Sequence, residues 1–404
     1  MISVKLKDIT VNITDGKHGD CKNQHGSGYF FISCKDILDG QIQYEGARQI
    51  TKEDFIETHK RTKLAPNDIL ITNSGTIGRM AIVKDIPETF KTTFQKSVAI
   101  VKPKTSEVYP LYLYYLLKSK VTDFVNSSNG AAQKNLLLST LRDFELKIVS
   151  SKILQCRIAE ILSRYDFLIE NYQKQVKLLE ESAQRLYKEW FVDLRFPGYE
   201  NTKIVDGVPE GWEKKQIKDI CSLITSGGTP SRNNKSFWNN GNIKWVKTKE
   251  LNDTWIIDTE EHITEIGLNS SSAKIFPPNT LLMAIYASPT LGRLGILGYE
   301  ACCNQAALGF IPKEFVSWQW LFYKLYELRD KFNSIARGAG QQNISAIVVK
   351  DMEIIVPEKN LIDKYTSFVT EMFNRQKTII CEIKLLTEAR GRLLPKLMSG
   401  EIEV

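Results

Sequence analysis

The sequence predicts an α+β protein made of two similar mixed units, each followed by a long helix, and three observations support this class. Segments of the first half recur in the second half at a nearly constant offset. Apolar residues follow a helical spacing over residues 151–191 and again over 359–397. The 404 residues are 42% hydrophobic and 25% charged, which is typical of a folded chain with two to three domains.

The repeat is visible in several separate blocks. Leu64–Ile71 (LAPNDILI) recurs as Phe276–Met283 (FPPNTLLM), 212 residues later. Ile77–Val83 and Leu291–Leu297 both carry a Gly-Arg pair and lie 214 residues apart. Similar offsets relate GAAQKN to GAGQQN, LRDFEL to VKDMEI, and the two copies of KDI. The drift is small, so we interpret the chain as a tandem duplication of a unit of about 200 residues, with a pseudo-twofold internal repeat.

Residues 1–150 form the first mixed unit, and residues 201–358 form the second. Short apolar runs bounded by Asn-Asp, Ser-Gly and Gly-Arg turns predict strands near 68–72, 81–84 and 97–102. Residues 109–120 predict a short helix, and residues 318–329 are its counterpart.

Residues 151–200 contain the first long helix. No Pro or Gly occurs in 151–191, and Pro197-Gly198 then stops the helix. Its apolar positions step by three and four residues, which is the pattern of a coiled-coil seam. They are Leu154, Ile158, Ile161, Tyr165, Leu168, Tyr172, Val176, Leu179, Leu186 and Trp190.

Residues 359–404 contain the second long helix, whose seam is interrupted by Arg375 and Arg390. We expect Pro395 to kink or end this helix. The two helices are expected to pack against each other as an antiparallel coiled coil, and the alternative is an exposed stripe that binds another chain. The second seam comprises Leu361, Tyr365, Phe368, Met372, Ile379, Ile383, Leu386 and Leu393.

The charge and cysteine content restrict the class of protein only loosely. There are 54 Lys and Arg against 47 Asp and Glu, and residues 1–150 hold 21 basic and 16 acidic side chains. This excess suits a polyanion partner but is common in other proteins.

The seven cysteines form no CxxC pair, which predicts reduced thiols and a cytoplasmic protein. We expect no membrane span and no signal peptide, because no apolar run is long enough.

Two similar units, each joined to a long helix, have a geometry that would suit the reading of two DNA half-sites separated by a fixed gap. DNA-binding dimers place their two readers about one helical turn, ~34 Å, or a multiple of it apart. Two units that differ in their loops would read different half-sites. A coiled-coil scaffold without DNA specificity would have the same plan, so this alternative stays open.

Four segments carry a resemblance to a known family. They are VPEGWE at 208–213, GGTPSR at 227–232, RLYKEWFVD at 185–193 and RLLPKLMSGE at 392–401. With the duplication, the chain resembles the specificity (S) subunit of Type I restriction-modification systems over nearly its whole length. The resemblance implies that residues 1–150 and 201–358 are target-recognition domains for the two halves of a bipartite, asymmetric site. It also implies that helices 151–200 and 359–404 are spacers that set the gap.

The resemblance also implies the partners and cofactors. Double-stranded DNA and two modification (methyltransferase) subunits are the expected partners, and restriction subunits are a further candidate. The chain itself is expected to be a non-catalytic subunit without a cofactor. S-adenosylmethionine would bind the modification subunits, and ATP and magnesium would bind the restriction subunits.

Base-reading residues in this family vary, so candidates are chosen here by chemistry. Arg, Lys, Asn, Gln, Ser and Thr in loops bind base edges or phosphates, and Gly lets a backbone approach closely. The competing interpretation is that residues shared by both copies only form turns. The candidates are Lys17, His18, Asn73, Ser74, Thr76, Arg79, Gln133, Lys134, Asn135, Thr229, Ser231, Arg232, Lys247, Lys249, Tyr286, Ser288, Arg293, Gln341, Gln342 and Asn343.

Catalytic motifs are missing from the sequence. It has no Asn-Pro-Pro-aromatic loop, no phosphate-binding GxxxxGK[ST] loop and no GxGxxG after a strand. His18, Cys21, His25 and Cys34 are zinc-ligand types, but their spacing matches no familiar module, and no metal site is predicted. A stand-alone nuclease or methyltransferase with an unrecognised site remains the alternative function.

Overall fold

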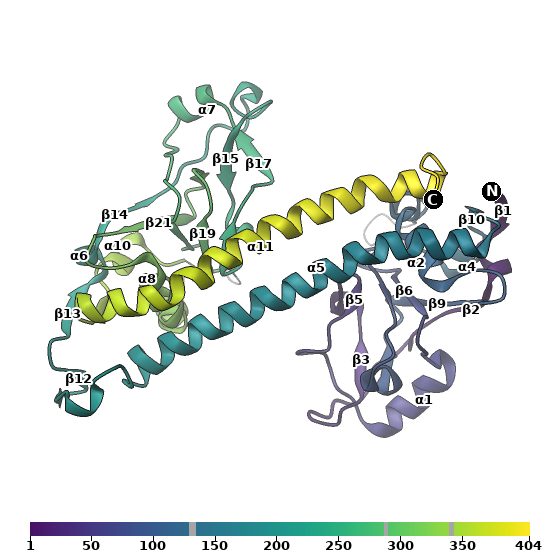
Figure 1. Ribbon diagram of the computed structural model, residues 1–404, viewed down its shortest axis with the longest axis horizontal. Helices are drawn as coiled ribbons and strands as arrows, with labels where there is room; N and C mark the ends of the chain where they lie inside the picture. The colour runs from purple at the N-terminus through teal and green to yellow at the C-terminus, as the bar shows by residue number, and fades with distance from the viewer. Residues whose placement is uncertain (129–134, 287–289, 339–342) are drawn as a thin grey trace. The chain divides into compact units, whose positions relative to one another are not determined.

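The computed structural model describes residues 1–128, 135–286, 290–338 and 343–404, and it divides into two compact units. Unit 1 comprises Met1–Leu168 and Leu386–Val404, and unit 2 comprises Ile169–Leu385. The long helices α5 (Lys152–Tyr187) and α11 (Lys359–Ser399) each contribute to both units (Figure 1). The fold is therefore α+β with an internal repeat, as the sequence predicts.

Unit 1 is built on a four-stranded sheet in the order β2-β9-β6-β7, in which all neighbours are antiparallel. Smaller sheets pair β1 with β10, β3 with β8 and β4 with β5. The strands are β1 (Ile2–Lys5), β2 (Thr10–Asp15), β3 (Phe30–Ile32), β4 (Ile37–Leu38), β5 (Gln41–Ile42), β6 (Ile69–Thr72), β7 (Met80–Ile82), β8 (Thr92–Phe94), β9 (Val98–Pro103) and β10 (Glu145–Ile148).

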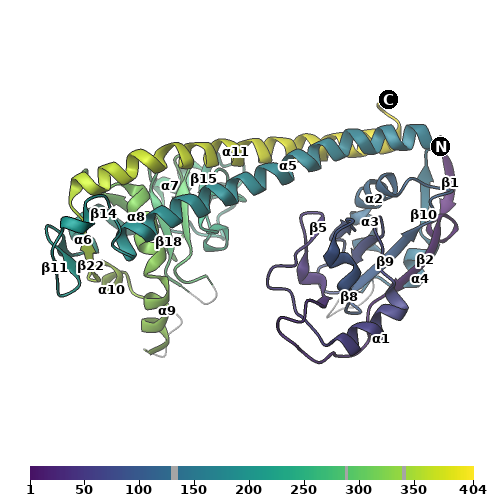
Figure 2. The same ribbon diagram turned by 60° about the horizontal axis from the view of Figure 1, so that its bottom comes forward.

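The helices of unit 1 cover this sheet from two directions. They are α1 (Lys52–Thr62), α2 (Pro110–Lys118), α3 (Val121–Asn126) and α4 (Leu138–Asp143). Helix α2 lies beside α5, and Tyr115 Oη donates a 2.6 Å hydrogen bond to Asp166 of α5. Helix α1 lies on the side of the strands that is remote from α5 (Figure 2).

Unit 2 repeats this plan with a five-stranded sheet in the order β14-β21-β18-β19-β16. Its strands are β11 (Ile204–Val205), β12 (Val208–Pro209), β13 (Glu213–Gln216), β14 (Cys221–Ser226), β15 (Ile243–Val246), β16 (Thr254–Ile256), β17 (Glu261–Ile263), β18 (Leu281–Ala284), β19 (Leu294–Leu297), β20 (Cys302–Cys303), β21 (Ala307–Pro312) and β22 (Glu353–Val356). Its helices are α6 (Ile217–Ile220), α7 (Glu265–Asn269), α8 (Trp318–Glu327), α9 (Arg329–Gly338) and α10 (Ala346–Lys350).

The repeat extends to strand register. In unit 1, Ile2 of β1 pairs with Ile148 of β10, and in unit 2, Glu213 of β13 pairs with Val356 of β22. Helix α8, the counterpart of α2, packs on the sheet and contacts both long helices. Gln319 donates to Thr370 of α11 at 3.3 Å, and Tyr323 Oη donates to the carbonyl of Glu180 of α5 at 3.2 Å. The same layers therefore recur in both units.

The two long helices run antiparallel within each unit. In unit 1, Arg390 of α11 forms an ion pair with Asp166 of α5. In unit 2, Tyr365 Oη of α11 donates to the carbonyl of Ala183 of α5 at 3.3 Å. Arg390 therefore has a partner in the seam, although the sequence suggested only an interruption there.

Two expectations for α11 are corrected. Phe368 is 60% exposed, although its ring contacts that of Trp190 at 5.8 Å between centroids. The buried stripe runs instead through Tyr365, Val369 and Phe373, because these residues face α8 and α5. Of the two outcomes expected for Pro395, an end of the helix is ruled out, because Pro395 lies inside α11. The other predicted seam residues are buried or half-buried.

Candidate nucleic-acid interface

The polarity of the strands in unit 1 gathers several polar loops at one end of its sheet. Strands β2 and β6 end there, whereas the antiparallel β9 and β7 begin there. Lys17-His18 follows β2, Asn73–Thr76 follows β6, and Arg79 precedes β7. The sequence could not place the first of these next to the others, because β2 is separated from β6 by more than 50 residues.

Backbone hydrogen bonds tie these loops into one frame. The amide of Lys96 donates to the carbonyl of Lys17 at 3.1 Å, and the amide of Asn73 donates to the carbonyl of Ser97 at 3.0 Å. The amide of Leu136 in turn donates to the carbonyl of Asn73 at 2.8 Å. Because backbone groups form the frame, the outward side chains can vary without loss of the loop positions.

Unit 2 contains the same frame with different side chains. The amide of Gly228 donates to the carbonyl of Cys303 at 2.9 Å, where unit 1 has Lys17 donating to Phe94 at 2.8 Å. The amide of Ile344 donates to the carbonyl of Ile285 at 2.9 Å, which corresponds to the bond between Leu136 and Asn73. The loops after β14, after β18 and before β21 therefore lie together in unit 2.

Shared glycines at this end of each sheet have a structural role. A Cβ atom on Gly16 would lie 2.0 Å from the carbonyl oxygen of Phe94, and one on Gly227 would lie 1.9 Å from that of Cys303. Gly78 and Gly292 have φ angles of +88° and +78°, which side chains rarely adopt. The turn interpretation therefore accounts for the duplicated glycines.

The candidate residues of unit 1 differ in whether their side chains are exposed and unpaired enough to contact DNA. Lys17 Nζ lies 3.4 Å from both Asp54 and Glu57, and His18 Nε2 lies 2.8 Å from Asp15, so each faces a carboxylate. Asn73 is 8% exposed, and its amide oxygen has no hydrogen-bond partner within the described ranges. The buried Asn73 amide is poorly placed to read a base.

The other unit 1 candidates lie on the loop after β6. Thr76 is exposed, Ser74 and Asn135 form an isolated β-bridge, and Arg79 Nη1 donates to the carbonyl of Cys34 at 3.5 Å. This arrangement brings residues 74 and 135 together, as a shared site requires. Gln133 and Lys134 lie outside the described residues.

The cationic candidates of unit 2 form an ion network with two carboxylates. Arg232 donates to Glu261 at 2.7 Å and lies over the ring of Trp238 at 3.7 Å. Lys247 and Lys249 lie 2.9 and 2.7 Å from Glu260, and Lys247 lies 3.3 Å from Glu261. Hydrogen bonds from the two lysines lower the pKa of the Glu260 carboxyl to about 2.

The remaining unit 2 candidates are more dispersed. The hydroxyl of Thr229 bonds to the side chain of Gln305, and the carbonyl of Ser231 accepts a 3.1 Å bond from Trp238 Nε1. Tyr286 and Asn343 are exposed, and Arg293 is half-buried after the turn that follows β18. Ser288, Gln341 and Gln342 lie outside the described residues.

Two lysines were missed by the sequence analysis. Lys35 follows β3 and Lys96 follows β8, and because these two strands are parallel, both lysines lie at the end where β9 begins. The amide of Cys34 donates to Ser97 Oγ at 3.3 Å, which holds these two segments together. Both side chains are exposed and form no ion pair with any residue of the described ranges. Neither lysine lies in a recognisable repeat block, so no sequence pattern distinguishes them from other exposed lysines.

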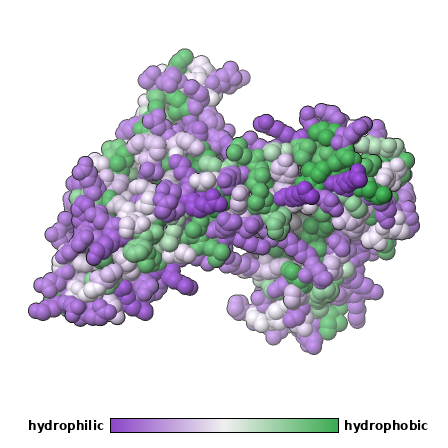
Figure 3. Space-filling model, in the orientation of Figure 1, coloured by the Kyte–Doolittle hydropathy of each residue, from purple (hydrophilic) through white to green (hydrophobic). Residues whose placement is uncertain are grey.

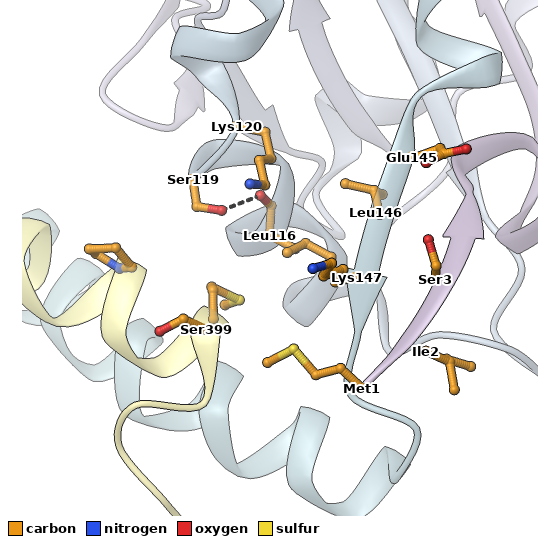
Figure 4. A pocket seen from close by; sticks show the side chains of 12 residues that line it. Met1, Ile2, Ser3, Leu116, Ser119, Lys120, Glu145, Leu146, Lys147 and Ser399 are labelled. Carbon is orange, nitrogen blue, oxygen red and sulfur yellow. Dashed lines mark hydrogen bonds between the residues drawn. The ribbon is translucent and has the colours of Figure 1, made fainter.

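A cavity of unit 1 lies away from the candidate residues. A cavity of about 900 Å³ lies between the β1–β10 pair, the end of α2 and the last turns of α11. Figure 4 shows Met1 extending toward the turn that carries Ser399, while Ser119 donates to the carbonyl of Leu116. None of the candidate DNA-binding residues lines it. Within the described ranges, no group of three His, Cys, Asp or Glu side chains is placed to hold a metal ion.

Comparison with known proteins gives consistent results. The family model described as "Type I restriction modification DNA specificity domain" matches residues 3–181 and 209–384. The Type I restriction enzyme MjaIX specificity subunit of Methanocaldococcus jannaschii is 28% identical over 99% of this chain and 93% of its own length. The HindI specificity subunit of Haemophilus influenzae is 25% identical over 75% of this chain and 80% of its own.

A solved structure shares the fold. The Type I restriction-modification S subunit from M. genitalium superposes with a TM-score of 0.61 at 14% identity, covering 98% of this chain and 95% of that one. In this chain, no helix of the described ranges is long and apolar enough to cross a membrane.

Proposed function

The chain belongs to the Type I restriction-modification DNA specificity family, and from this premise we propose how its two units divide the recognition of DNA. Its function is that of a specificity subunit of a Type I restriction-modification system. We propose that unit 1 reads one half of a bipartite, asymmetric site and that unit 2 reads the other half. The comparisons do not support a stand-alone nuclease or methyltransferase.

The observation that carries this proposal is the duplicated loop frame with unlike side chains. In both units, backbone bonds fix the loops at the same end of the sheet, as with Leu136 on Asn73 and Ile344 on Ile285. The residues on this frame differ: Ser74 follows Asn73 in unit 1, whereas the exposed Tyr286 follows the matching Ile285 in unit 2. Identical frames with unlike surfaces suit two readers of different half-sites, because base edges are distinguished by side-chain donors and acceptors.

We further propose that α5 and α11 dock two modification subunits and set the gap between the half-sites. Leu178 of α5 and Leu385 of α11 occupy equivalent repeat positions, and both are exposed, at 62% and 64%. Ile153 and Phe167 of α5 are exposed in unit 1, where Figure 3 shows hydrophobic side chains gathered over the helices. Exposed apolar residues on a helix favour a protein partner.

In this proposal, the chain positions the DNA and the partners perform the chemistry. A modification subunit with S-adenosylmethionine would take an adenine out of the duplex and methylate its amino group, because the target atom is shielded in stacked DNA. Restriction subunits, where they join the complex, would use ATP and magnesium. The complex would act on DNA in the cytoplasm.

Selection from a random-sequence duplex pool tests this function. The chain, co-expressed with its modification subunits, is incubated with the pool at fixed salt, and bound DNA is sequenced. We expect two short conserved blocks that are separated by a gap of constant length. Binding without an enriched motif would contradict the reader function and favour a basic scaffold.

A further inference from the structure

We propose that the two units hold DNA by different physical means: unit 1 supplies an attraction to phosphate through Lys35 and Lys96, whereas the matching face of unit 2 pairs Arg232, Lys247 and Lys249 with Glu260 and Glu261. This inference rests on the proposed function and goes beyond it, because it assigns the salt dependence of binding to one unit. The partner chemistry is the phosphate backbone of duplex DNA.

The unit 1 lysines are free to bind phosphate. Lys35 and Lys96 are exposed, and neither forms an ion pair with the described residues. They project from segments that the Cys34–Ser97 hydrogen bond of 3.3 Å joins, so two positive charges leave the frame at neighbouring points. A duplex phosphate can approach such lysines without displacing a protein carboxylate, and it releases condensed counterions when it does.

The matched position of Lys35 in unit 2 is Lys249. Each precedes a carboxylate residue that closes a short helical turn: Asp36 accepts from the amide of Ser33 at 2.8 Å, and Glu250 accepts from that of Lys247 at 2.7 Å. The matched lysines differ in one respect, because Lys249 lies 2.7 Å from Glu260. Among the described residues, the same backbone turn therefore presents an unpaired lysine in unit 1 and a paired one in unit 2.

The matched position of Lys96 is Gln305. The preceding residues make equivalent bonds, with the amide of Gln95 donating to Ile32 at 2.9 Å and that of Asn304 donating to Val246 at 3.0 Å. Lys96 carries a charge, whereas Gln305 is neutral and bonds to Thr229. Both matched positions thus lose an available positive charge in unit 2.

The carboxylates of unit 2 also restrain its other cations. Arg232, Lys247 and Lys249 share Glu260 and Glu261, so three positive charges face two negative ones. A phosphate would have to compete with these carboxylates and would be repelled by them. The network instead holds Arg232 in a defined orientation over Trp238, which suits a base contact better than a diffuse attraction.

The salt dependence of DNA affinity separates the two units. Each neutralised phosphate contributes about 0.9 to the slope of log K against log salt concentration. We expect Lys35→Gln with Lys96→Gln to reduce the magnitude of the slope by about 2. The matched control Lys249→Gln in unit 2 is expected to leave the slope nearly unchanged. An equal reduction by Lys249→Gln would overturn the inference.

Two reciprocal variants test why the two units contribute differently to the salt dependence. Glu260→Gln removes the carboxylate that pairs with Lys249, so it should steepen the slope by about 1. Gln305→Lys places a lysine at the position that matches Lys96, and it should also steepen the slope by about 1. These two variants, the Lys35→Gln/Lys96→Gln double variant and Lys249→Gln are all measured as complexes with the modification subunits. Thermal melting confirms that each variant is folded. Unchanged slopes for both reciprocal variants would contradict the neutralisation argument.

The inference and the proposed function can fail separately. If the wild-type complex enriches a split motif but the unit 1 double variant keeps the wild-type slope, the charge assignment fails and the reader function stands. If no motif is enriched, the reader function fails whatever the slopes are.

Discussion

At the scale of single residues, whether a cationic side chain can contact DNA depends on neighbours that are distant in sequence. Lys17 was a reasonable candidate, yet α1 brings Asp54 and Glu57 within 3.4 Å of its ammonium group. Lys35 and Lys96 have no such neighbours in the described structure and were not chosen. Several loops that the sequence suggested lie together at one end of the sheet, but the sequence could not show which cations are paired, because pairing is a tertiary property.

The ionisation of Glu260 provides a prediction at this scale. Lys247 and Lys249 hold its pKa at about 2, below the ordinary 4.5, because they donate hydrogen bonds to the charged carboxylate. The ion pairs are therefore fully formed above pH 4.5, and they are lost as the pH falls through about 2. Carboxyl ¹³C NMR should show Glu260 charged at pH 3.5.

Lys249→Gln supplies the control for this titration, since it removes one donor and should move the pKa of Glu260 upward. A carboxyl that titrates near its ordinary value in the wild-type protein would show that the network does not form in solution.

At the scale of elements, the long helices were the most predictable part of the fold. Three- and four-residue apolar steps predicted α5, and its seam residues are buried or half-buried. The detail of α11 was not predictable in the same way. Tyr365 contacts α5 and Phe373 contacts α8, so packing within unit 2 shifts the buried stripe away from Phe368.

Two phenylalanines of α11 test that stripe. Phe373 is 1% exposed, and its ring lies 4.9 Å from that of Trp318, whereas Phe368 is 60% exposed. We expect Phe373→Ala to lower the free energy of unfolding by about 3–5 kcal/mol, because it empties a packed site. Phe368→Ala, a chemically identical change, should cost about 1 kcal/mol or less. Denaturant unfolding measures both, and equal costs would place the seam where the sequence predicted it.

Pro395 shows a second limit of sequence reasoning at this scale. Proline was expected to kink or end α11, and of these the end is ruled out, because the helix continues to Ser399. Leu397 and Met398 are buried in the core of unit 1, and this packing opposes the local cost of the proline. Tertiary contacts therefore extend the helix beyond the point that local rules allow.

At the scale of the whole molecule, duplication is the feature that the sequence revealed best. Repeat offsets predicted two units, and the structure shows that even strand register is shared, as in the β1–β10 and β13–β22 pairs. The repeat also limits what sequence can show, because shared residues such as Gly16 and Gly227 are explained by backbone contacts. Recognition must depend on the residues that differ, and no repeat identifies those.

The measurement that tests the division of recognition most directly is motif selection with one unit altered at a time. Complexes with Ser74→Ala in unit 1, or Tyr286→Ala at the matching position of unit 2, are compared with the wild type on the same random duplex pool. We expect the unit 1 variant to blur one block of the split motif and the unit 2 variant to blur only the other, with the gap unchanged. If either variant alters both blocks, the two units do not read separate half-sites.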